Sequence, residues 1–93
     1  MPEGFEWDPE KEQDNRRKHG VGFDEARTVF EDPGALIKPD PVHSLGEERY
    51  IILGRSSRDR LLVVVHTDRG DLVRIISARP ATPRERRAYE EGS

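Results

Sequence analysis

Residues 48–78, ERYIILGRSSRDRLLVVVHTDRGDLVRIISA, contain most of the isoleucine, leucine and valine residues of this 93-residue chain. Three stretches of this segment, 48–55, 60–67 and 72–78, have the composition of β-strands. The polar connections SSRD and DRGD between them are of hairpin length, which predicts an antiparallel meander. Stretch 60–67 is apolar at both odd and even positions, so we expect it to be the central strand, covered on both faces.

A helix is predicted before this segment, over residues 9–19. Asp8 and Pro9 are typical of a helix start, and Gly20 is typical of a helix end. The interior of this helix has no aliphatic side chain, so little of it can enter a core. We expect the neighbouring Phe5 and Trp7 to anchor it.

The remaining elements complete an α+β pattern. We expect a short helix at residues 23–30, a strand at 35–38 and a loop at 39–47. Thr82 and Glu85 form a capping box that opens a C-terminal helix. The sequence thus predicts one domain over residues 1–93, in which N-terminal helices and a C-terminal helix pack on an antiparallel sheet of about four strands.

Composition limits the classes of function. The chain has no cysteine, which excludes disulfides and thiolate metal sites and favours a cytoplasmic protein. We find no signal peptide and no apolar run long enough to span a membrane. The net charge of −3 is uneven: residues 1–47 carry −6, whereas residues 48–93 carry +3, with arginine as their only basic residue besides histidine. This pattern indicates an anionic partner for the second part, or reflects only the arginine usage of a GC-rich genome.

Two arginines are candidate catalytic residues. Arg74 interrupts an apolar strand face, and Arg79 follows at the end of that strand. Together their guanidinium groups could bind an RNA phosphate and stabilise charge that develops on it. The structural alternative is an arginine at a sheet edge that is paired with Glu85 or Asp59.

The three histidines have different contexts and no metal-ligand spacing, so no metal and no other cofactor is expected. His66 lies in the central strand, where a hydrogen-bonded core residue is more common than a catalyst. His19, at the end of the first helix, could contact RNA or interact with the helix dipole. His43 lies in the loop at residues 39–47, after Pro39 and Pro41. Trp7 and Tyr89 could stack on bases, although core positions are the simpler explanation.

The ordered segments FEWDPEK, NRRKHGVGFDEA, VFEDP, GEERY, VVVHT and RIISARPATPRERRAYE resemble the BrnT family of toxins, at that family's spacing and over residues 5–91. The resemblance implies a compact RelE-like domain that cleaves RNA without a metal and blocks translation. It also implies a BrnA-type antitoxin, through which the pair would bind operator DNA. Carried onto this sequence, the candidates are Arg74 and Arg79 as catalytic residues and Arg49, Lys18, His19, Arg86 and Tyr89 as RNA-binding residues. His66 could be the catalytic proton-transfer group, and the general base is not assigned.

The sequence favours one function, and a second function from another class is the alternative. The first is an endoribonuclease toxin that acts by attack of the RNA 2′-hydroxyl on the adjacent phosphate. The second is a binding module without catalytic activity that engages its antitoxin and acts as a co-repressor. A chain that binds DNA alone is disfavoured, because the sequence has no helix-turn-helix pair.

Overall fold

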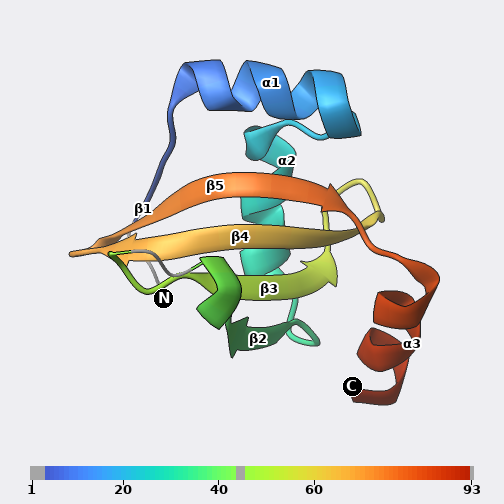
Figure 1. The fold of residues 1–93 in the computed structure, drawn as a ribbon. Helices are drawn as coiled ribbons and strands as arrows, with labels where there is room; N and C mark the ends of the chain where they lie inside the picture. The colour runs from blue at the N-terminus through green and yellow to red at the C-terminus, as the bar shows by residue number, and fades with distance from the viewer. Residues whose placement is uncertain (1–3, 44–45, 93) are drawn as a thin grey trace.

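The computed structural model describes residues 4–43 and 46–92, and its centre is a sheet in the order β1-β5-β4-β3-β2 (Figure 1). The predicted meander is confirmed as β3 (Tyr50–Arg55), β4 (Leu61–Arg69) and β5 (Leu72–Pro80). β4 is the central strand, as its apolar composition predicts. Residues 44–45 of the predicted loop lie outside the described residues.

The predicted α+β fold, with N-terminal helices and a C-terminal helix packed on a sheet, is confirmed, and the sheet differs in one respect from the predicted antiparallel sheet of about four strands. The sheet has five strands and is mixed, because β1 (Gly4–Glu6) pairs in parallel with β5. A three-residue strand has no pattern of its own, and it forms where β5 presents free backbone groups. At the other edge, β2 (Leu36–Pro39) pairs antiparallel with β3.

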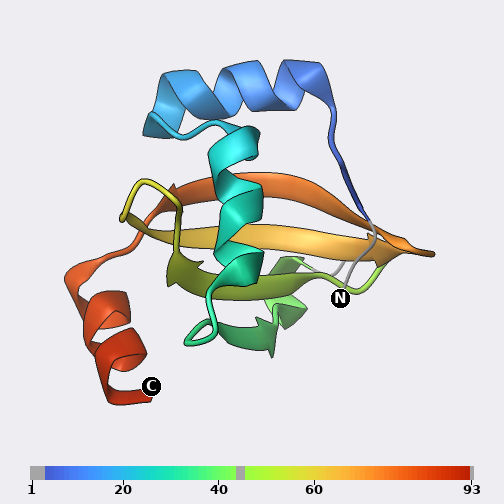
Figure 2. The ribbon, with the colours of Figure 1, turned by 180° about the vertical axis from the view of Figure 1, so that it is seen from behind.

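One face of the sheet, here called the helix-covered face, packs against α2 (Phe23–Ala26) and the 3-10 helix η1 (Arg27–Glu31), which together form the predicted helix over residues 23–30 (Figure 2). The core on this side contains the largest fully buried side chains of the described residues. Its members are Val21, Phe23, Ala26, Val29, Ile52, Leu62, Val64, Ile75 and Ala78.

The opposite face, here called the open face, carries Ile51, Val63 and Val65. α3 (Pro83–Gly92) covers one end of it, where Tyr89 packs against Leu53, Leu61 and Val63. The predicted capping box is present, since the Glu85 amide donates to Thr82 Oγ1 at 3.2 Å and the Thr82 amide donates to Glu85 Oε1 at 2.8 Å. The short 3-10 helix η2 (Pro41–His43) lies in front of β3 on this face (Figure 1).

α1 (Pro9–His19) has the predicted ends, with the Asp8 carboxylate accepting from the Glu10 amide at 2.9 Å and Gly20 in the left-handed conformation. It lies along β5 in both views (Figures 1 and 2). The predicted anchors pack as expected, Phe5 on Phe30 and Trp7 on Phe23, with ring centroids 5.1 and 6.0 Å apart.

A further anchor of α1 is a polar side chain, Asn15, which is 6% exposed. Its Nδ2 donates to the carbonyl oxygens of Val21 and Ala78, both at 2.8 Å, and its Oδ1 accepts from the Ala78 amide at 3.0 Å. Ala78 lies on β5 beyond the three residues that pair with β1. The Asn15 amide therefore takes the place of a neighbouring strand at this edge.

None of the described helices is long and apolar enough to cross a membrane.

Candidate functional site

A cleft of about 410 Å³ opens on the open face of the sheet. Its floor is apolar and comes from β3, β4 and β5, whereas its rim carries polar and charged groups from α1, the segment after β2 and the end of β5. The lining residues are His19, Asp40, Val42, Arg49, Ile51, Val63, Val65, Ile76, Ser77 and Arg79. Three of the residues predicted from the sequence, His19, Arg49 and Arg79, are thus brought together although 60 positions separate the first from the last.

Each of these three side chains has a definite origin in the fold. His19 is the last residue of α1, so the attachment of α1 through Asn15 places it at the cleft. Arg49 directly precedes β3, and its carbonyl oxygen accepts from the Asp40 amide at 2.9 Å. Its guanidinium lies 3.6 Å from the Glu47 carboxylate.

Arg79 is held by a bidentate ion pair. Its Nη1 and Nη2 donate to the two carboxylate oxygens of Glu85, each at 2.8 Å, and its side chain is 41% exposed. Hydrogen bonding from Arg79 lowers the pKa of Glu85 to about 2, and the same bonds raise the pKa of Arg79. Because Glu85 also accepts from Thr82, the first turn of α3 fixes the position of the Arg79 guanidinium.

Arg74 and Arg79 stand five residues apart, so a regular strand would place them on opposite faces. The ladder between β4 and β5 shifts register between Val65 and His66, and Ile76 is skipped in the pairing. This bulge places both arginines on the open face. Sequence periodicity alone does not reveal it.

Arg74 does not line the cleft. Its Nη1 donates to Glu6 Oε2 at 2.6 Å, across the parallel pair of β1 and β5 in which the two residues are directly opposite. The alternative of structural pairing thus applies to Arg74, but with Glu6 in place of the Glu85 and Asp59 predicted. Those two carboxylates instead contact Arg79 and Arg55.

His66 lies on the helix-covered face and is 4% exposed. Its ring packs edge-on against Phe30 with centroids 4.8 Å apart, and Nδ1 lies 3.4 Å from the Val64 carbonyl oxygen. Burial lowers its pKa, which favours the neutral ring. The structure therefore does not bring His66 together with the arginines of the cleft.

Residues 7–85 match the family model described as the ribonuclease toxin BrnT of type II toxin-antitoxin systems. The chain belongs to the BrnT family. The crystal structure of the Brucella abortus ribonuclease toxin BrnT is similar in fold, with a TM-score of 0.68 and 23% identity over 85% of this chain and 96% of that one. A search of curated proteins gave no match.

The other RNA-binding candidates of this BrnT-family chain lie apart from the cleft. Lys18 and Arg86 are exposed on α1 and α3, and neither lines it. The Tyr89 hydroxyl donates to Asp32 Oδ2 at 2.7 Å, and the Arg55 guanidinium lies over its ring, 5.6 Å from the centroid. Tyr89 thus holds α3 against the sheet, a position in which its ring is already covered by a cation.

The cleft contains two polar residues that sequence reasoning missed. Asp40 is 5% exposed and lies between Pro39 and Pro41, and Ser77 is the small residue that follows the bulge in β5. The sequence held only a weak signal for Asp40, a carboxylate between two prolines in a loop. It held none for Ser77.

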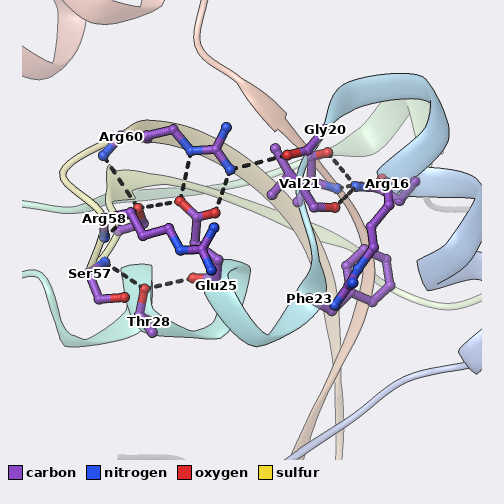
Figure 3. A network of polar contacts seen from close by, with 12 residues as sticks. Arg16, Gly20, Val21, Phe23, Glu25, Thr28, Ser57, Arg58 and Arg60 are labelled. Carbon is purple, nitrogen blue, oxygen red and sulfur yellow. Dashed lines mark hydrogen bonds and ion pairs between the residues drawn. The ribbon is translucent and has the colours of Figure 1, made fainter.

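A separate polar network lies at the edge where α2 meets the β3–β4 connection (Figure 3). Glu25 is buried, accepts from Arg60 Nε at 2.9 Å and from Ser56 Oγ at 2.6 Å, and is joined by a second bond from Arg60. Hydrogen bonding from Arg60 lowers the pKa of Glu25. Arg60 also donates to the Gly20 carbonyl oxygen at 3.2 Å, which fixes the chain directly after His19.

Proposed function

We propose that this chain is a metal-independent endoribonuclease that cleaves RNA in the cleft of the open face. The observation that carries the proposal is the meeting of His19, Arg49 and Arg79 at one cleft with a hydrophobic floor. Two guanidinium groups can stabilise the charge that develops on a phosphodiester during cleavage, and an imidazole can transfer protons in the same reaction. Membership of a ribonuclease toxin family supports the same activity.

In the proposed reaction the 2′-hydroxyl oxygen forms a bond to the adjacent phosphorus, and the bond from phosphorus to the 5′-oxygen breaks. The products are a 2′,3′-cyclic phosphate and a 5′-hydroxyl end. Arg49 and Arg79 bind the non-bridging oxygens and stabilise their growing negative charge. His19 takes the proton of the 2′-hydroxyl and then donates a proton to the leaving 5′-oxygen, because an imidazole can both accept and donate protons.

The cognate partner is proposed to be a BrnA-type antitoxin, and operator DNA is bound only through the toxin-antitoxin complex. Because both proposed nucleic acids occur in the cytoplasm, the chain is proposed to act there. The charge of −6 on residues 1–47 supports contact with a basic partner segment away from the arginines of the second part. Lys18 and Arg86, exposed on the two helices, are proposed to contact the RNA backbone outside the cleft.

Cleavage by the purified chain tests the proposal. Parent, Arg79→Gln and His19→Gln are incubated with a labelled oligoribonucleotide in excess EDTA, with Arg87→Gln on the exposed side of α3 as the control. We expect cleavage by parent and control, and a loss of about 10²–10³-fold in each cleft variant. Circular dichroism verifies that the variants are folded. Equal cleavage by all four proteins would refute the assignment of the cleft, and dependence on added metal would refute metal independence.

A second function, a non-catalytic antitoxin-binding module that acts as co-repressor, is favoured by one observation. The guanidinium groups of Arg74 and Arg79 are both engaged by carboxylates, Glu6 and Glu85, in the free chain. Induced expression of the chain without its antitoxin separates the two functions. Growth arrest with RNA degradation supports the nuclease, whereas normal growth with retained antitoxin binding supports the module.

A further inference from the structure

A second hollow on the open face, here called the side pocket, has a volume of about 280 Å³ and lies between β2 and α3. Its lining is mostly aliphatic, with one lysine and one carboxylate at the rim. The residues are Leu36, Ile37, Lys38, Ile51, Leu53, Val63, Glu85 and Ala88.

The side pocket adjoins the cleft. Ile51 and Val63 line both hollows, so the two share part of one floor. Glu85 connects them a second time, because it lines the side pocket and holds Arg79 of the cleft through two hydrogen bonds of 2.8 Å. A ligand whose anionic group lies in the cleft therefore has its neighbouring atoms at the side pocket.

The chemistry of the side pocket suits one flat, partly apolar group. Its volume of about 280 Å³ lies just below the range for small-molecule sites, roughly 300–1,000 Å³, so it has room for one small group only. A stable protein interface covers about 800 Å² on each partner, far more than this hollow provides. Lys38 at the rim can donate to ring carbonyl and nitrogen acceptors, and Ile37, which is 61% exposed, offers an aliphatic surface.

We infer that the side pocket binds the nucleobase of a nucleotide next to the cleaved phosphate, and so contributes to the choice of cleavage site. The inference rests on the proposed function of the cleft. A base held against Leu36, Ile37 and Ala88 leaves its phosphate over the shared floor, where Arg79 lies. Lys38 donates to the edge of that base, which favours bases with acceptors there.

Substrates that lack one base test the inference. The rate of cleavage is measured on an intact oligoribonucleotide and on two matched ones in which the nucleotide on one or the other side of the cleaved bond is abasic. Ala88→Phe fills the side pocket from an exposed position of α3, and Ile37→Ser removes part of its wall. Glu90→Phe adds the same ring to α3 at an exposed position outside both hollows.

We expect the parent to cleave the intact RNA about tenfold faster than one of the abasic RNAs, the size of effect that contacts to the edge of a base produce. Ala88→Phe should cleave the intact RNA at the abasic rate and leave the abasic rate unchanged. Ile37→Ser should reduce the ratio of the intact-RNA rate to the abasic-RNA rate, and Glu90→Phe should keep the parental ratio. A ratio near one in the parent, or a parental ratio in Ala88→Phe, would overturn the inference.

Failure of the inference and failure of the proposed nuclease give different results. A parent that cleaves every RNA equally retains the nuclease and loses the base pocket. If the parent cleaves nothing, the ratio is read instead from binding of the same oligonucleotides with 2′-O-methyl groups, which need no cleavage. If Ala88→Phe changes only the affinity for the antitoxin, the side pocket docks protein and the inference is wrong.

Discussion

Replacement of Asn15 by alanine should detach α1 from the sheet. The side chain makes three hydrogen bonds of 2.8–3.0 Å to backbone groups of Val21 and Ala78, and it is buried. At about 0.5–1.5 kcal/mol for each bond, the loss is about 1.5–4.5 kcal/mol. Alanine returns about 0.5 kcal/mol through its higher helix propensity. We therefore expect the free energy of unfolding to fall by about 2–3 kcal/mol.

Urea unfolding followed by circular dichroism measures this loss, and Gln13→Ala is the matched control, because Gln13 is exposed on the same helix. For a domain of this size the loss corresponds to a fall of roughly 10–20 °C in the melting temperature. An Asn15→Ala protein within about 0.5 kcal/mol of the control would refute the view that this amide, and not apolar burial alone, holds α1 to β5. Reduced RNA cleavage by the variant would follow from displacement of His19.

Two predictions concern pH. Arg79 holds the pKa of Glu85 at about 2, against 4.5 in the unfolded chain, so the pair stabilises the fold above pH 4.5 and loses this effect as the pH falls toward 2. The full pKa shift corresponds to about 3 kcal/mol of stability, and solvent screening of the 41% exposed Arg79 reduces this to about 1–2 kcal/mol. Glu85→Gln should remove this acid-dependent loss of stability from unfolding curves recorded between pH 6 and pH 2. Burial lowers the pKa of His66 from 6.5 in the folded state. The neutral ring therefore contributes its full stability above pH 6.5, and this contribution declines as the pH falls from 6.5 toward the lower pKa of the folded state. His66→Leu should flatten the dependence of stability on pH in this range and retain RNA cleavage. Loss of cleavage in a folded His66→Leu protein would make His66 a catalytic candidate again.

Local signals predicted the elements well because each depends on neighbouring residues only. Asp8, Gly20 and the Thr82–Glu85 capping box mark helix ends through bonds within one turn. Residues 60–67 are apolar at both odd and even positions, which predicted the central place of β4, because only a strand covered on both faces can bury such a run. The pairing of β1 with β5 could not be predicted, since it depends on which edge of the finished sheet is left free.

The candidate site was predicted less completely. His19, Arg49 and Arg79 were named individually, but that they share one cleft follows from the attachment of α1 and the bulge in β5. Arg74 was given a catalytic role because it interrupts an apolar strand, whereas its partner Glu6 lies on a strand that the residue pattern does not reveal. Side-chain partners 68 positions apart are set by register between strands, which no local pattern encodes.

By itself, the sequence determined the family and the order of the main elements, because motif spacing, caps and apolar periodicity are properties of adjacent residues. Tertiary structure alone decided which charges meet. In the folded chain the buried Asn15 amide is bonded to the edge of β5, and His66 is buried on the helix-covered face of the sheet. The Arg79–Glu85 pair lies between the cleft and the side pocket. The physical reason is that burial and ion pairing depend on distances in space, which strand register and helix docking set only when the whole chain has folded.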